Sequence, residues 1–132
     1  MGEEMTDKEL LELAAKAAGW TWWKSKHGYW NITPPQEVQR SCCVGWQKFD
    51  PHTGDALEEP TPADAIVECN WNPLTDDGDA LRLAVKLELD VMCASVRSVD
   101  DAVDITIDAG TDIYAATRRA IVRAAAEIGK QV

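Results

Sequence analysis

Long apolar segments are missing from this chain of 132 residues. No run approaches the roughly 20 apolar residues that a bilayer-spanning helix needs. The N-terminal stretch MGEEMTDKE is acidic, whereas a secretory signal opens with basic residues and continues into an apolar segment. We therefore expect a cytoplasmic protein that makes no contact with a membrane.

Histidine is scarce, and the common catalytic motifs are missing. His27 and His52 fall in predicted turns, and the chain contains no Gly-x-Ser-x-Gly, no His-Glu-x-x-His and no phosphate-binding loop. We therefore expect a protein that is not an enzyme and that holds no cofactor and no metal ion. One enzymatic alternative stays open, a magnesium-dependent nuclease site formed by four carboxylates: Asp76, Asp77, Asp104 and Asp108.

Cysteine is too sparse for a disulfide framework. The chain has 4 cysteines and no secretion signal, a combination that favours reduced thiols. Cys42 and Cys43 are adjacent, so on a strand they would point to opposite faces and would not bind one zinc ion together. With 45% hydrophobic residues the chain can close one modest core. We expect residues 1–132 to form a single domain.

No basic residue occurs between Asp50 and Asp79, although this stretch contains nine acidic ones. It therefore carries most of the net charge of −10. Such a charge repels nucleic acid and attracts basic partners. We predict that acids of this stretch form a partner-binding surface: Asp50, Asp55, Glu58, Glu59, Asp64, Asp76 and Asp77. The alternative is a solvated surface that keeps the protein soluble.

Aromatic residues gather near the N-terminus, where Trp20, Trp22, Trp23 and Trp30 lie close to lysines. This mixture can stack the bases of single-stranded nucleic acid. The net charge argues against that role, and aromatics on a hairpin more often cover a core or contact a partner protein. Trp22 and Trp23 are neighbours on a predicted strand and so point to opposite faces. We expect at least one of them to be exposed, and we assign both to the partner-binding surface.

Three segments have the apolar spacing of helices. The first begins with Thr6 and Glu9 in the pattern of a capping box. The second follows an acidic turn whose aspartates suit the positive end of a helix. The predicted starts and ends are Thr6 and Gly19, Gly78 and Leu87, and Asp112 and Gly129.

Strands are predicted where β-favouring residues cluster or alternate with polar ones. We expect a hairpin at 20–32, a strand at 41–49, a turn at 50–54, a strand at 65–69 and a second hairpin. The second hairpin pairs residues 89–94 with 103–108 through a turn at 98–101, and its second strand has a polar outer face. Together these elements predict an α+β fold in which an antiparallel sheet packs against about three helices.

Three segments resemble the phage alpha-beta-alpha sandwich domain family, whose members are small tailed-phage proteins. These segments are MTDKELLELAAKAAG at 5–19, WNPLTDDGDALRLAVKL at 71–87 and AATRRAIVRAAAEIG at 115–129. The resemblance implies an alpha-beta-alpha sandwich and a phage setting, and so the cytoplasm of a bacterial host. It implies no active site.

The charge, the tryptophans and the resemblance together predict a small acidic protein that acts by binding. The preferred partner is a basic host protein that handles nucleic acid or serves in defence. The acidic surface would inhibit it by standing where nucleic-acid phosphates bind. We expect no direct binding to nucleic acid. The alternative from another class is a module that binds a small molecule or nucleotide in a pocket between sheet and helices.

Overall fold

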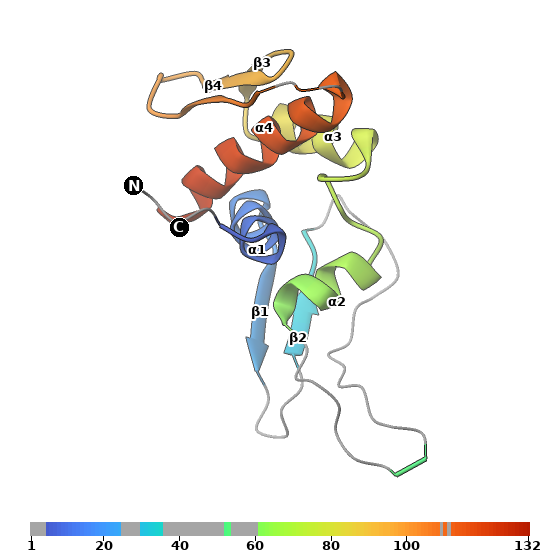
Figure 1. The fold of residues 1–132 in the computed structure, drawn as a ribbon. Helices are drawn as coiled ribbons and strands as arrows, with labels where there is room; N and C mark the ends of the chain where they lie inside the picture. The colour runs from blue at the N-terminus through green and yellow to red at the C-terminus, as the bar shows by residue number, and fades with distance from the viewer. Residues whose placement is uncertain (1–4, 25–29, 36–51, 54–60, 109, 111) are drawn as a thin grey trace.

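The computed structural model describes residues 5–24, 30–35, 52–53, 61–108, 110 and 112–132. Within these ranges the chain forms helices and two small antiparallel sheets (Figure 1). The helices are α1 (Asp7–Ala18), α2 (Pro62–Glu68), α3 (Asp77–Lys86) and α4 (Ile113–Gly129). The strands are β1 (Thr21–Lys24), β2 (Trp30–Thr33), β3 (Leu89–Met92), β4 (Ser95–Ser98) and β5 (Asp104–Thr106). The α+β class predicted from the sequence is confirmed.

Helix α4 lies in the middle of the molecule. It packs against the sheet of β3, β4 and β5 on one side and against α1 on the other, with α3 beside it (Figure 1). Helix α2 and the β1–β2 hairpin lie beyond α1, at the end of the molecule opposite the three-stranded sheet (Figure 1). The strands are thus divided between the two ends of the molecule, and helices fill the space between them.

Both ends of α1 follow the sequence prediction. The Thr6 hydroxyl oxygen accepts a hydrogen bond from the Glu9 N–H at 3.2 Å. Gly19 adopts a left-handed conformation with φ of 101°, and the next N–H, that of Trp20, bonds back to the carbonyl oxygen of Ala15 at 2.9 Å. This arrangement of glycine and following residue ends a helix while satisfying its last carbonyls. It also directs Trp20 into the core, where its ring lies 5.4 Å from that of Trp71.

The predicted hairpin at 20–32 is confirmed. Strands β1 and β2 pair antiparallel, with Trp22 opposite Ile32 and Trp23 opposite Asn31. The predicted strand at 41–49 lies outside the described residues. Of the predicted turn at 50–54, the described residues His52 and Thr53 do form a turn.

The predicted strand at 65–69 is wrong, because this segment belongs to helix α2. Thr61 caps the helix: its hydroxyl accepts from the Asp64 N–H at 3.3 Å, and the Asp64 carboxylate accepts from the Thr61 N–H at 2.9 Å. Pro62 follows the cap and already has the backbone angle of a first helical residue. Reciprocal capping outweighs the strand preference of Ile66 and Val67.

The second predicted hairpin is also wrong in its pairing. Strand β4 lies between β3 and β5 and pairs with both of them. The predicted turn near 98–101 exists, but it connects β4 to β5. The turn between β3 and β4 consists of Cys93 and Ala94, and Cys93 has φ of 52°. Two-residue hairpin turns usually carry glycine, asparagine or aspartate at positive φ, so the sequence gives no signal for this one.

Helix α4 begins as predicted at Asp112, whose carboxylate accepts hydrogen bonds from the N–H groups of Tyr114 and Ala115. It ends at Gly129, which lies against the backbone of α1. A Cβ atom placed on Gly129 would lie 1.9 Å from the carbonyl oxygen of Leu13. Six alanines of the two packed helices have no exposed surface: Ala14 and Ala15 of α1, and Ala120, Ala124, Ala125 and Ala126 of α4. The small side chains allow the two helices to approach closely.

Replacing Gly129 by Ala should therefore lower the free energy of unfolding by about 1–3 kcal/mol, because the new methyl group meets rigid backbone. Gly78→Ala is the matched control, since a Cβ there first meets the flexible end of Arg82 at 3.1 Å, and alanine favours a helix over glycine. We expect Gly78→Ala to keep or raise stability. Urea denaturation of both variants is the measurement, and equal midpoints would contradict the close packing.

Candidate functional site

The seven acids predicted to bind a partner divide into two groups. Four of them lie outside the described residues: Asp50, Asp55, Glu58 and Glu59. The other three, Asp64, Asp76 and Asp77, each make hydrogen bonds or ion pairs within the chain. In the described part of the chain these three acids therefore have structural roles. The sequence predicted the helix cap of the acidic turn at Asp76, but not the contacts of Asp64 or the ion pair of Asp77.

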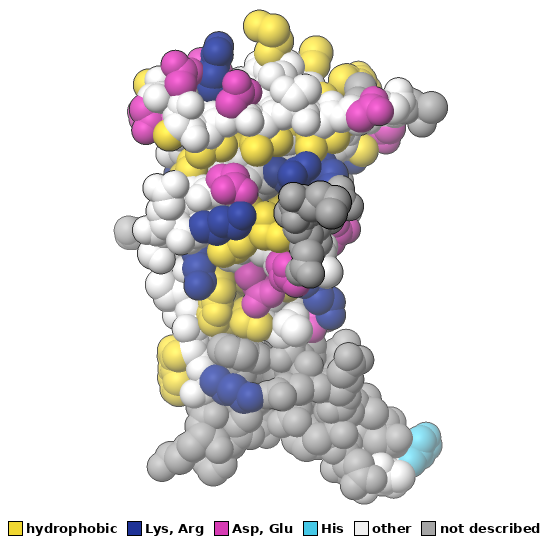
Figure 2. All heavy atoms as spheres, turned by 60° about the vertical axis from the view of Figure 1, so that its left-hand side comes forward, with side chains coloured by type: hydrophobic (Ala, Val, Ile, Leu, Met, Phe, Trp, Pro, Cys, Tyr) yellow, Lys and Arg dark blue, Asp and Glu magenta, His cyan; other side chains and the backbone are white. Residues whose placement is uncertain are grey.

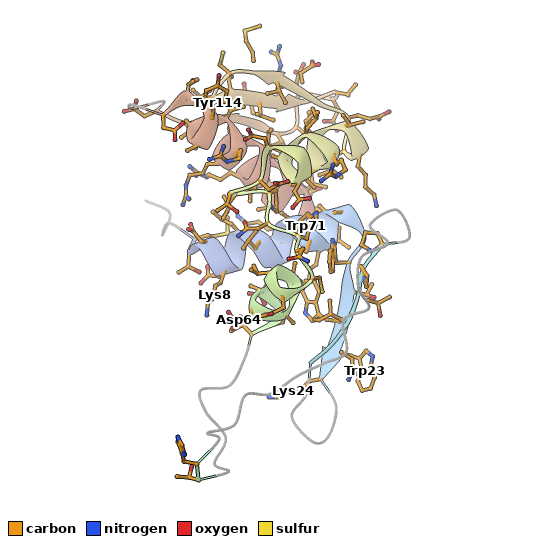
Figure 3. All side chains as sticks on the ribbon, turned by 90° about the vertical axis from the view of Figure 1, so that its right-hand side faces the viewer. Lys8, Trp23, Lys24, Asp64, Trp71 and Tyr114 are labelled. Carbon is orange, nitrogen blue, oxygen red and sulfur yellow. The ribbon has the colours of Figure 1, made fainter. Side chains whose placement is uncertain are left out.

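Asp64 connects α2 to α1. Besides its capping bonds, its carboxylate lies 3.1 Å from the ammonium of Lys8 (Figure 3). Partial burial raises the pKa of this carboxyl, but the hydrogen bonds from Thr61 and the ion pair with Lys8 outweigh that effect and lower the pKa below its usual range. Burial raises the pKa of Glu12 nearby, and repulsion from Asp64 and Glu9 adds to the increase.

The opposite pKa shifts of Asp64 and Glu12 predict opposite contributions to the stability of the fold as the pH falls. The stabilisation from Asp64 is complete above the unfolded-state pKa of about 4 and is lost as the pH falls through its lower folded-state pKa. Glu12 has a raised folded-state pKa, so its charged form destabilises the fold, and this destabilisation is relieved as the pH falls and the carboxyl is protonated. We therefore expect Asp64→Asn to lose less stability than the wild type between about pH 5 and pH 2.5, and Glu12→Gln to lose more. Urea denaturation across this range is the measurement, and parallel curves for all three proteins would contradict both assignments.

The acidic turn before α3 is a helix cap, as predicted. The Asp76 carboxylate accepts from the Asp79 N–H at 2.8 Å. Asp79 is buried, and its own carboxylate accepts from the Asn72 N–H at 2.9 Å and pairs with Arg82 at 2.7 Å. Asp77 pairs with Arg118 of α4 at 2.7 Å. Within the described ranges, no three His, Cys, Asp or Glu side chains lie close enough to hold a metal ion.

The two adjacent tryptophans point in opposite directions, as predicted. Trp22 is partly buried against the core, and the ammonium of Lys16 lies 5.7 Å from the centre of one of its rings. Trp23 is 60% exposed and projects away from the hairpin (Figure 3). Of the two, Trp23 has the geometry of an interface anchor.

A second acidic surface, which the sequence analysis did not single out, lies on the three-stranded sheet. We call it the acidic sheet face. It holds five exposed acids, one base and two exposed apolar side chains: Glu88, Asp90, Asp100, Asp101 and Asp104, with Arg97, Met92 and Val99. The strand register places Arg97 between Asp90 and Asp104, which gives one row of three charges. Figure 2 shows acidic and hydrophobic side chains together at this end of the molecule, at the top of the view.

One carboxylate of this face, that of Asp100, accepts two hydrogen bonds. The Ser98 hydroxyl donates to the Asp100 carboxylate at 2.7 Å, and the Ala102 N–H donates to it at 3.1 Å. These bonds lower the pKa of Asp100 below its usual value. The predicted polar outer face of the last strand is confirmed, since Asp104 and Thr106 are exposed while Val103 is buried. The sequence analysis did not predict strand β4, which lies in the middle of this sheet.

An apolar hollow of about 400 Å³ lies beside this face, between α3, β3 and the start of α4. We call it the Tyr114 hollow, after the side chain that is 71% exposed on its wall. Leu81, Val91 and Ile113 also line it, and the ion pair of Asp77 with Arg118 contributes to its wall. Val91 and Met92 are neighbours on β3 and point to opposite sides of the sheet, so the hollow lies on the side that faces the helices, at the edge strand β3. Exposed apolar side chains in such a setting are typical of a protein interface.

A second hollow of about 420 Å³ lies on the other side of Leu81. We call it the Trp pocket. Its lining includes Trp20, Trp71, Leu81, Val85, Arg82 and Lys86. Leu81 lines both hollows and therefore forms the ridge between them. Helix α3 thus presents an apolar outer surface as well as its buried side, which holds Ala80, Leu83 and Ala84.

The fold and these surfaces define an α+β protein with an acidic sheet face and two hollows that share helix α3. In the parts of the chain that the structure describes, no helix combines the length and the apolar character needed to cross a membrane. Comparison of the chain with protein-family models, curated proteins and solved structures finds no match.

Proposed function

We propose that the protein acts by binding a basic partner protein through the acidic sheet face and the Tyr114 hollow. The observation that carries this proposal is the exposure of large apolar side chains among carboxylates. Met92, on the acidic sheet face, is 78% exposed, and Tyr114, on the wall of the hollow, is 71% exposed. Such side chains lose contact with water when a partner covers them, which favours association.

Charge defines the kind of partner. The acidic sheet face holds five carboxylates and one guanidinium, and the whole chain has a net charge of −10. A basic surface would be attracted over a long range, which raises the rate of association, whereas a nucleic acid would be repelled. The acidic face supplies this attraction, and the apolar side chains supply contact once the partner has arrived.

The hollow provides the site for an anchor. An interface usually depends on a few large side chains that fill pockets near its centre. The Tyr114 hollow has apolar walls from Leu81, Val91 and Ile113, and Tyr114 itself can cover an apolar side chain of the partner. An apolar residue flanked by lysine or arginine on the partner has the chemistry that matches this arrangement.

The resemblance to the phage alpha-beta-alpha sandwich domain family supports a phage setting for this binding. In that setting the partner is a basic protein of the bacterial host that handles nucleic acid or serves in defence. Carboxylates of the sheet face would lie where nucleic-acid phosphates bind, and the protein would act as an inhibitor by mimicry. Exposed Trp23 belongs to the opposite end of the molecule and is a candidate for a separate contact.

The test is a pulldown from bacterial lysate with four matched baits. These are the wild type, Tyr114→Ala, a neutral variant with Asp90→Asn and Asp104→Asn, and Val67→Ala. Val67 is an exposed residue of α2, remote from the sheet, and serves as the control. We expect a basic protein that the wild type and Val67→Ala retain and that the other two baits lose.

Rate constants with this partner then separate the two contributions. The neutral variant should associate about tenfold more slowly at low salt and show a flatter salt dependence. Tyr114→Ala should mainly speed dissociation, by about tenfold or more. Competition with DNA for the partner tests mimicry. Mimicry predicts that DNA displaces this protein from the partner, and a partner that binds both at once would contradict it. Capture of the same proteins by all four baits would contradict the proposed surface.

A further inference from the structure

The two parts of the proposed binding surface lie on opposite sides of the three-stranded sheet. Asp90 and Met92 point to the solvent side, whereas Val91 points to the helix side and lines the Tyr114 hollow. Strand β3 lies at the edge of the sheet, with β4 as its neighbour. A partner that contacts both parts therefore crosses a sheet edge, and β3 is the edge that borders the hollow.

The backbone of β3 directs hydrogen-bonding groups out of this edge. At the two ends of β4, the Ser98 N–H and the Ala94 carbonyl oxygen make hydrogen bonds of 2.9 Å to the residues on either side of β5. Because bonds alternate in direction along an antiparallel strand, Val96 also bonds toward β5. Val91 lies opposite Val96, so the N–H and C=O of Val91, and those of Leu89, point away from β4. Within the described residues, no bond from another segment reaches these groups.

The edge of β3 is open to solvent. Val91 is 41% exposed, although its side chain points to the helix side of the sheet. Tyr114, from the start of α4, lies beside the sheet (Figure 3) and continues the wall of the hollow. At the other edge, β5 has three residues and none of them lines the hollow. An edge strand that is so short offers little to an added strand, which leaves β3 as the edge for a partner.

Charge determines which side chains fit beside β3. On the solvent side, Asp104, Arg97 and Asp90 form one row in which the sign of the charge alternates. A lysine or arginine beside Asp90 would continue this alternation, and opposite charges on neighbouring strands stabilise a sheet. The adjacent residue of an added strand would point to the helix side, where the hollow accepts an apolar side chain. A second copy of this chain would instead bring another charge of −10 and be repelled.

We infer that the partner adds an extended segment to the edge of β3 as a further antiparallel strand, an inference that rests on the proposed function. The main chain of this segment bonds to the N–H and C=O groups of Leu89 and Val91. One apolar side chain lies beside Val91 in the Tyr114 hollow, and the next side chain, a lysine or arginine, lies beside Asp90. In such strand addition the main chain gives affinity and alternate side chains give specificity.

The experiment uses the capped peptide Gly-Lys-Ile-Arg-Ile-Lys-Gly as the probe. Its isoleucines match Leu89 and Val91, and its arginine matches Asp90. Amide chemical shifts of the full chain measure the affinity and locate the site. We expect a Kd near or below about 1 mM, with the largest shifts at residues 89–92 and at Tyr114.

Two N-methylated forms of the probe test whether its main chain pairs with β3. Methylation of both isoleucine nitrogens removes the donors that would face β3, so we expect it to weaken binding at least about tenfold. Methylation of the arginine nitrogen and one lysine nitrogen removes donors that would face solvent. This form has the same number of methyl groups, and we expect it to bind within about threefold of the parent probe.

Charge variants of the protein test the pairing beside Asp90. Asp90→Lys should weaken binding of the parent probe at least about fivefold. Glu68→Lys makes the same change in net charge at an exposed position of α2, remote from the sheet, and should leave the affinity within about twofold. Sedimentation of the chain alone should show a monomer. A dimer that the probe dissociates would assign the edge to a second copy and overturn the inference.

Strand addition is also overturned if the parent probe does not bind, if its shifts lie away from β3, or if the two methylated forms bind equally. The pulldown described above decides the proposed function separately. Equal binding of the two forms, with a partner that the Tyr114→Ala bait loses, would mean that the surface binds its partner without an added strand. Capture of the same proteins by all four baits, with binding lost only by the isoleucine-methylated form, would contradict the proposed function but not strand addition at β3.

Discussion

The close contact between α1 and α4 is the constraint on which the rest of the structure depends. Gly129 has no room for a side chain because the carbonyl group of Leu13 occupies that space, and both helices carry fully buried alanines. Helix α4 therefore has α1 on one side and the three-stranded sheet on the other. The end of α1 then turns Trp20 toward Trp71, so this single packing contact also builds one wall of the Trp pocket.

Ion pairs between distant segments change how the charge of the sequence is distributed in space. The acids of residues 50–79 look like one negative block along the chain, but Asp64 pairs with Lys8 from α1 and Asp77 pairs with Arg118 from α4. A further pair, Asp7 with Arg119, joins α1 to α4. The ends of the chain thus neutralise part of its acidic middle. Among the described residues, the acids of the sheet form the more extended negative surface, and this is where the proposed partner binds.

The helix caps were predictable because capping is a local interaction. Thr6, Asp76 and Asp112 each bond to N–H groups two or three residues further along the chain, so their sequence pattern is sufficient. Strand β4 could not be predicted, because its turn at Cys93 and Ala94 lacks the residues that usually mark one. Helix α2 was assigned as a strand because its β-branched residues were weighed without the reciprocal cap of Thr61 and Asp64. Strand alternation alone predicts that either Trp22 or Trp23 is exposed, but it does not predict that the exposed one is Trp23.

The sequence by itself determined the α+β class, the positions of three helices, the hairpin of β1 and β2 and the acidic character of the molecule. These follow from periodicity, caps and composition, which act over a few residues. Only the tertiary structure decided which acids are used internally, which side of α3 is exposed and where the two hollows lie. Leu81 and Val85 have the same helical spacing as core residues, and the packing of α4 and α1 leaves them outside. The reason is that burial depends on which segments meet in space, and no local pattern records that.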